Sequence, residues 1–192
     1  MFKYKHYVIF ITLVIFGLAA FFLISSGYYP ILSINGTMIS ARTFWKNYQA
    51  GSLYYQNILL TYELEIEEKD VISETDLKRS VLTQIIENNL IDQEVRRELG
   101  DDLDLLVTNK LSDLGSQAKL QEAAQTLYGL PLNDFEQEIL VPLAKQEILT
   151  GRLFLDGENL DTWLSNNKKV SNIKIFSREF YWDGEEVQVS ND

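Results

Sequence analysis

The sequence contains no cysteine and a single histidine, His6, among its 192 residues. The absence of Cys excludes disulfides, thiolate nucleophiles and zinc sites built on thiolates. Because the only His lies near the N-terminus, the rest of the chain also lacks the parts of a Ser–His triad or a histidine metal site. We therefore expect no catalytic residue, no metal site and no cofactor, and we expect that the protein is not an enzyme.

Acidic residues are missing from the first 60 positions, which hold the four basic residues Lys3, Lys5, Arg42 and Lys46. The whole chain has 17 Lys and Arg against 28 Asp and Glu, so residues 61–192 keep 13 basic against 28 acidic side chains, a net charge of −15. A region this acidic repels phosphate backbones. We expect no nucleic-acid partner.

The longest hydrophobic run, Tyr7 to Ile24, has 18 residues without a charge. As a helix it spans about 27 Å, close to the thickness of the hydrocarbon core of a bilayer. The alternative is a signal peptide cleaved near Ser25-Ser26-Gly27, but the hydrophobic stretch of a signal peptide usually has about 7–15 residues. We expect residues 7–24 to stay in the bilayer as a transmembrane helix.

The charges beside this run predict its orientation. Lys3 and Lys5 precede it, and the next charged residue is Arg42. By the positive-inside rule, residues 1–6 form a cytoplasmic tail and residues 30–192 an extracytoplasmic domain. The sequence thus predicts a single-pass protein of the cell membrane that contacts lipid through the hydrophobic run.

The rest of the sequence predicts a mainly α domain with small β-hairpins at both ends. Asn35-Gly36 is a two-residue hairpin signal between short strands in residues 31–39, and Asp183-Gly184 is expected to turn a hairpin in the tail that pairs with the first. Apolar residues at intervals of three and four indicate helices between them. These helices are expected at 41–62 after the cap Ser40, from Ser73 or Thr75 to Gly100, at 103–114, at 117–128, from the cap Asn133 through a kink at Pro142, and at 160–165.

Three passages resemble a known family. Ile34 to Ser40 (INGTMIS), followed by Phe44, resembles the opening hairpin and first helix of the SurA-like N-terminal chaperone domain, which also occurs in PpiD and PrsA foldases. Leu82 to Glu94 is similar to the central helix of that family, and Tyr128 to Phe135 is similar to the entry of its next helix. The similarity covers about residues 31–165. It implies a SurA-N-like helical domain behind a membrane anchor.

Members of this family often carry a parvulin-type prolyl isomerase domain of about 90 residues. The residues around the helical region are too few for such a domain, and parvulin sites use histidines, whereas the only His here is His6 on the expected cytoplasmic side. The resemblance therefore implies no isomerase activity. A remnant of a peptidyl-prolyl isomerase family member is one alternative interpretation.

Aromatic residues are concentrated in the expected first helix. Six rings on several sides of one helix cannot all enter a core, and exposed Tyr and Trp rings suit the binding of extended polypeptides. The alternative is that they pack against neighbouring helices or lie at the lipid surface. The predicted polypeptide-binding surface comprises Phe44, Trp45, Tyr48, Tyr54, Tyr55 and Tyr62.

Carboxylates also gather in the sequence, at Glu63 to Asp70 and at Asp101 to Asp104. Charge runs of this kind are usually solvated turns, and we interpret them so. Asp156 and Glu158, with Asp161, offer oxygen atoms to a calcium ion, although without the spacing of an EF-hand. This calcium site is a minor hypothesis.

The sequence as a whole predicts a membrane-anchored, non-catalytic, chaperone-like protein whose partners are unfolded or nascent exported polypeptides. A scaffold or assembly factor that binds one folded partner at the membrane is the main alternative. The sequence leaves the oligomeric state open.

Overall fold

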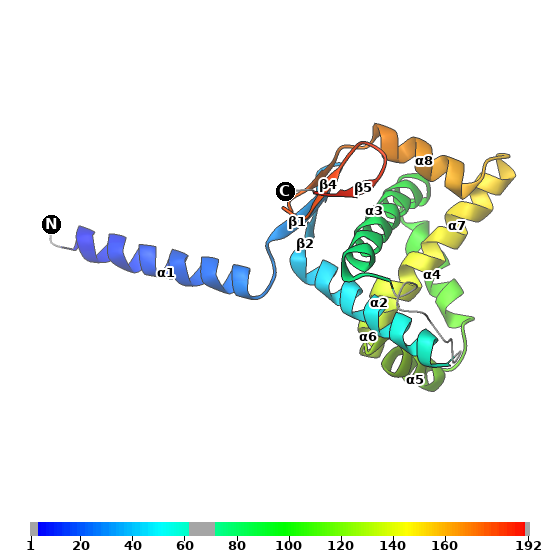
Figure 1. Cartoon of the computed structure of the whole chain (residues 1–192), viewed down its shortest axis with the longest axis horizontal. Coiled ribbons are helices and arrows are strands. Elements are labelled where there is room, and N and C mark those ends of the chain that lie inside the picture. The colour runs from blue at the N-terminus through cyan, green and yellow to red at the C-terminus, as the bar shows by residue number, and fades with distance from the viewer. Residues whose placement is uncertain (1–3, 62–71, 191–192) are drawn as a thin grey trace.

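The computed structural model describes residues 4–61 and 72–190 and is mainly helical, with short β-hairpins. One long helix projects away from a domain of packed helices and strands (Figure 1). The elements in chain order are α1 (Lys5–Ser25), β1 (Pro30–Ile34), β2 (Thr37–Ser40), α2 (Ala41–Thr61), α3 (Glu74–Leu99), α4 (Asp102–Ser112), α5 (Gln117–Tyr128), α6 (Leu132–Phe135), the π-helical segment η2 (Glu136–Leu140), α7 (Val141–Leu155), α8 (Leu160–Val170), β3 (Ile173–Ile175), β4 (Phe180–Trp182) and β5 (Val187–Val189).

Helix α1 contains the hydrophobic run. Its segment Tyr7–Ser25 has 19 residues with a mean hydropathy of 2.8, and none of it is buried against the domain. A soluble core helix of this composition would bury its apolar face, since exposed apolar surface is costly in water. This helix is long and apolar enough to cross a membrane.

The N-terminal hairpin forms as predicted. Asn35 and Gly36 both have positive φ, 49° and 88°, as a tight hairpin turn requires. Strand β1 lies between β2 and β3 in a three-stranded sheet, with Leu32 opposite Ile39 on one side and Ile175 on the other. Leu32 and Ile34 are completely buried in the core.

The C-terminal tail differs from the prediction in its pairing. It supplies β3 to the first sheet, whereas β4 and β5 form a separate two-stranded hairpin around Asp183 and Gly184. The two ends of the domain therefore meet, but through Ile173–Ile175 and not through the expected hairpin. Residues 176–179 belong to no strand and separate β3 from β4, so the tail has three strands and not the two of a single hairpin.

Helix α3 is the centre of the domain and agrees closely with its prediction. The Ser73 Oγ accepts a hydrogen bond from the Asp76 amide at 3.0 Å, so Ser73 and not Thr75 is the N-cap. Gly100 ends the helix with its amide bonded to the Arg96 carbonyl. One continuous stripe is buried against the sheet and the other helices: Val81, Leu82, Ile85, Ile86, Leu90, Ile91 and Val95.

The region around Pro142 departs from the prediction in two ways. The helix begins at Leu132 after Pro131, so Asn133 is inside its first turn and is not its cap. The expected kink takes the form of the π-helical segment η2, which leaves Pro142 in the first turn of α7, where a missing backbone donor costs little.

Helix α8 also differs from its prediction. It begins after a cap formed by the Asn159 side chain and continues to Val170, beyond the predicted end at residue 165.

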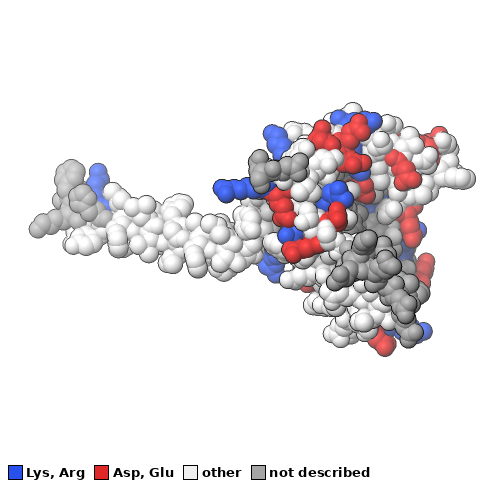
Figure 2. Space-filling view, viewed as in Figure 1, with Lys and Arg blue, Asp and Glu red and all other residues white. Residues whose placement is uncertain are grey.

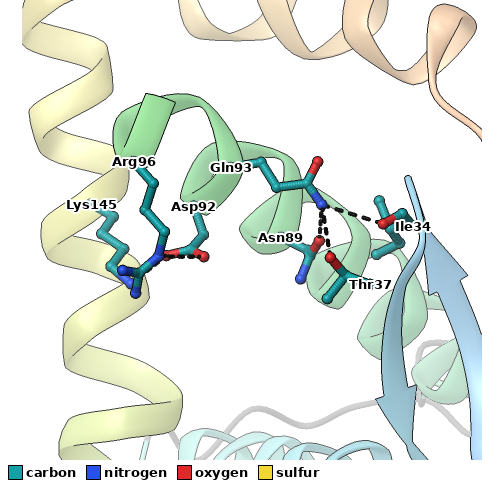
Figure 3. Close-up of polar contacts among 7 residues, drawn as sticks. All are labelled: Ile34, Thr37, Asn89, Asp92, Gln93, Arg96 and Lys145. Carbon is teal, nitrogen blue, oxygen red and sulfur yellow. Dashed lines mark hydrogen bonds and ion pairs between the residues drawn. The ribbon is translucent and has the colours of Figure 1, made fainter. Parts of the chain in front are cut away.

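Polar contacts attach the surrounding elements to α3. Asp92 binds both Arg96 and Lys145 of α7, and Gln93 Nε2 donates to Asn89 Oδ1 at 2.7 Å and to the Ile34 carbonyl at 3.3 Å (Figure 3). The hairpin turn is thereby fixed to the central helix.

Candidate polypeptide-binding site

A hollow of about 190 Å³, here called the Trp45 hollow, lies where α2, α3, β1 and the C-terminal tail meet. Its volume is similar to that of engineered protein cavities that hold a benzene ring. Most of its lining is apolar. The lining residues are Tyr29, Ile31, Phe44, Trp45, Lys78, Leu82, Ile175, Phe176, Ser177, Glu179 and Phe180.

Trp45 is held at the edge of the hollow by two neighbouring rings. It packs edge-on against Phe44, with ring centroids 5.1 Å apart, and edge-on against Tyr48 at 5.6 Å. Phe44 and Tyr48 in turn stack at 6.2 Å. Phe44 is buried and Trp45 is 43% exposed, so the cluster presents one rigid, accessible indole ring.

Lys78 supplies a cation beside this ring. Its Nζ lies 6.0 Å from the centre of the Trp45 ring and forms ion pairs with Glu74 at 2.9 Å and Glu179 at 3.4 Å. The hydrogen bond to Glu74 is the main reason that the pKa of Lys78 is raised above its ordinary value; burial opposes the shift, and the negative charge of Glu179 adds to it. Lys78 is therefore charged at neutral pH, and the apolar hollow has a charged rim.

The other predicted rings lie elsewhere. Tyr54 stacks on Tyr128 of α5 with ring centroids 4.8 Å apart, and the Tyr55 hydroxyl accepts a hydrogen bond from the Ile72 amide at 3.1 Å. Tyr128 is half-buried, and this burial, together with the proximity of Tyr54, raises the pKa of Tyr128 above its ordinary value. Tyr62 lies outside the described residues.

The structure thus divides the predicted surface. Phe44 and Trp45 line the Trp45 hollow and Tyr48 supports them, whereas Tyr54 and Tyr55 hold the far part of α2 against other segments. The alternative interpretation, packing against neighbouring elements, applies to these last two.

Sequence reasoning missed most of the hollow. Leu82 was expected only in the central helix and Phe180 only in the tail hairpin, and Lys78 and Phe176 were not singled out. The aromatic content of the tail was a usable signal, because rings at Phe176 and Phe180 exceed what a short exposed hairpin can bury by itself.

Among residues 4–61 and 72–190, no group of three or more His, Cys, Asp or Glu side chains is placed to hold a metal ion. Asp156, Glu158 and Asp161 therefore do not come together as a group of three carboxylates for a calcium ion. The acidic run Glu63 to Asp70 lies within residues 62–71, outside the described part of the chain.

No family model matches the chain, and no curated protein or solved structure is significantly similar to it. The resemblance to the SurA-like chaperone domain stays a prediction.

Proposed function

We propose that this chain is a membrane-anchored, extracytoplasmic chaperone-like protein that binds unfolded or extended segments of exported polypeptides without catalysing a reaction. The observation that carries the proposal is the Trp45 hollow, an apolar site with an exposed indole ring in a domain that continues directly from a membrane-length helix.

The anchor and its orientation form the first part of the proposal. An exposed apolar helix of 19 residues is stable in lipid and not in water, which supports retention of α1 in the bilayer. Lys3 and Lys5 on its N-terminal side support, by the positive-inside rule, a cytoplasmic N-terminus and a domain on the opposite side.

The hollow explains how such a domain binds varied clients. Burial of one Leu- or Phe-sized side chain contributes about 1.5–3 kcal/mol, which does not offset the cost of association alone, so capture also needs contacts of the client with the rim. The rim offers Lys78 and Glu179 to polar groups beside that side chain. A client needs only an extended segment with an exposed apolar residue, and no reacting group is required.

A second candidate function rests on a different feature. Phe154 and Leu155 are 80% and 83% exposed at the corner between α7 and α8, which lies on the side of the domain remote from α1 (Figure 1). An adjacent pair of exposed apolar side chains is typical of a contact with one folded partner. This feature favours the scaffold hypothesis.

The test uses the full chain in lipid nanodiscs and an unfolded model protein whose aggregation is followed by light scattering. The proposal predicts suppression by the wild-type chain, weaker suppression by Trp45→Ala, and unchanged suppression by Phe154→Ala, a matched exposed aromatic residue away from the hollow. If a molar excess of wild-type chain leaves aggregation unchanged, the chaperone proposal fails. If Phe154→Ala alone is defective, the remote corner and not the hollow is the binding surface.

A further inference from the structure

The segment between α1 and β1 is held against the domain by backbone hydrogen bonds. The Gly27 carbonyl accepts from the Arg42 amide at 2.8 Å, and the Tyr29 carbonyl accepts from the Ala41 amide at 2.9 Å. Gly27 has φ of +71°, and a Cβ there would lie 3.3 Å from the Arg42 nitrogen. The N-terminus of α2 is thus fixed to the chain that leaves α1, so one particular face of the domain adjoins the end of the apolar helix.

That face, here called the basic aromatic face, combines exposed rings with cationic side chains. Tyr28, Tyr29 and Phe176 are 49%, 43% and 50% exposed. The Phe176 amide donates to the Ile31 carbonyl at 2.7 Å, which keeps the loop after β3 beside the start of β1. We define this face by Tyr28, Tyr29 and Arg42, which follow α1 or contact that segment, and by the exposed residues Lys174, Phe176 and Arg178 of the adjoining tail, where β3 pairs with β1.

Three basic side chains belong to this face, and the neighbouring carboxylate of Glu179 is paired with Lys78. Residues 61–192 carry a net charge of −15, yet the exposed side chains of Arg42, Lys174 and Arg178 take part in none of the ion pairs among the described residues. The Arg42 guanidinium instead lies 5.4 Å from the centre of the Tyr28 ring and donates to its hydroxyl. Basic side chains project from the domain toward the side on which α1 lies (Figure 2).

We propose that the basic aromatic face rests on the surface of an anionic lipid bilayer, on the leaflet through which α1 leaves the membrane. Tyr and Phe rings favour the headgroup region, and Lys and Arg bind anionic headgroups. The acidic remainder of the domain is repelled by the same surface, so the domain is oriented as well as tethered. The inference rests on the membrane anchoring given under Proposed function, and it adds a second, peripheral lipid contact.

The lipid contact also determines where the Trp45 hollow lies relative to the membrane surface. Tyr29 and Phe176 belong both to the basic aromatic face and to the lining of the hollow. The hollow then lies at the level of the headgroups, where a polypeptide segment that emerges from the bilayer is first accessible.

The absence of Cys allows a direct test, because a single introduced Cys is the only site for a spin label. We compare Ser177→Cys, next to Phe176, with Leu155→Cys at the remote corner, each as the full chain in nanodiscs of phosphatidylglycerol mixed with phosphatidylcholine. The probes are the collision rates of the label with oxygen, which concentrates in lipid, and with a water-soluble nickel complex. Circular dichroism verifies that each labelled chain is folded.

The proposal predicts that the oxygen-to-nickel ratio at residue 177 is several-fold higher than at residue 155. In phosphatidylcholine alone, or with Lys174→Ala and Arg178→Ala together, the ratio at residue 177 falls toward that at residue 155. Retention of the chain in the disc with equal ratios at both sites overturns the surface contact alone. Loss of the chain from the disc overturns the anchoring as well.

Discussion

Tyr48 stabilises the position of Trp45 without lining the hollow itself. Aromatic pairs contribute about 0.5–1.5 kcal/mol beyond their buried area, so removal of this support loosens the indole ring. We expect Tyr48→Ala to weaken the binding of an unfolded client by about 2- to 10-fold, the equivalent of that energy. Fluorescence anisotropy of a labelled client with the full chain in nanodiscs measures the effect.

Tyr54→Ala is the matched control, since it also removes a stacked Tyr from α2, but at the end that contacts Tyr128. Both substitutions are expected to lower thermal stability, and only Tyr48→Ala is expected to lower affinity. Equal affinities for the two variants would contradict the role of the Phe44–Trp45–Tyr48 cluster.

Asn35 connects three parts of the chain through its side chain. Its Nδ2 donates to Gln93 Oε1 at 2.9 Å and to Ser171 Oγ at 3.4 Å, and its Oδ1 accepts from the Asn172 amide at 2.9 Å. Asn35→Gly keeps the positive φ of the turn but removes these bonds. Because each net hydrogen bond contributes about 0.5–1.5 kcal/mol, we expect a loss of about 1–3 kcal/mol in the free energy of unfolding, measured by urea denaturation in detergent.

Asn166→Ala on the exposed side of α8 serves as the control for Asn35→Gly and is expected to change stability little. An Asn35→Gly variant as stable as the wild type would show that the hairpin, α3 and the tail are not joined through this side chain.

Asp183 gives the C-terminal hairpin a dependence on pH. Its Oδ1 accepts hydrogen bonds from the Glu186 and Glu185 amides, each at 2.8 Å, and these bonds lower the pKa of Asp183 below its ordinary value. A lowered pKa means that the carboxylate stabilises the hairpin above the pKa of the unfolded state, and that this contribution is lost as the pH falls through the lower, folded value. We expect the amide NMR signals of Glu185 and Glu186 to shift in this acidic range.

In Asp183→Asn the acceptor oxygen stays but the titration is removed. We expect the acid-induced shifts of these two amides to be smaller in this variant, while those near distant carboxylates are unchanged. Identical acid titrations of Glu185 and Glu186 in both proteins would refute this assignment.

Among the elements, the helices α3 and α5 could be predicted almost completely from the sequence. Their signals are local: an apolar stripe, the cap Ser73, and the glycines Gly100 and Gly129 at the C-termini. The two hairpin turns could likewise be predicted from the adjacent residues Asn35-Gly36 and Asp183-Gly184.

Other elements depended on information that is distant in the sequence. The pairing of β3 with β1 joins residues about 140 positions apart, and the π-helical segment η2 stands where the sequence indicated only a kink at Pro142. Propensity and periodicity report only neighbours along the chain, so neither feature was accessible to them.

Replacing Gly51 or Gly129 by Ala is expected to change the stability of the protein in opposite directions. A Cβ at Gly51, inside α2, would lie 3.8 Å from Val81, an ordinary contact, whereas a Cβ at Gly129 would lie 2.7 Å from Leu53 at a φ of +64°. Gly51→Ala is therefore expected to stabilise the protein by about 0.5–1 kcal/mol, through the higher helix propensity of Ala. Gly129→Ala is expected to destabilise it by about 1–3 kcal/mol, through backbone strain and the clash. Thermal melts followed by circular dichroism measure both changes. A fall in melting temperature for Gly51→Ala would contradict the ordinary contact with Val81 and show that α2 and α3 leave no room for a methyl group.

At the scale of the whole molecule, the candidate site is assembled from four separate segments. The sequence indicated the rings of α2, because they are concentrated in one helix, but it did not indicate that the loop after β3 and the N-terminal half of α3 complete the Trp45 hollow. Likewise, the unequal charge of the two ends of the chain was visible in the sequence, whereas the pairing of β3 with β1, which brings the basic residues of the tail to the sheet that follows α1, required the fold.

The central claim is that the domain, held at the membrane by α1, captures exported polypeptides in the Trp45 hollow. Its most direct test is a photo-crosslinking residue in place of Trp45 in the full-length protein, activated in intact cells, with Phe154 replaced in the same way for comparison. We predict that the full-length protein is recovered in the membrane fraction and that position 45 crosslinks to many exported polypeptides, each in small amount. A clipped protein in the soluble fraction, or a single stoichiometric partner at position 45, would contradict the account.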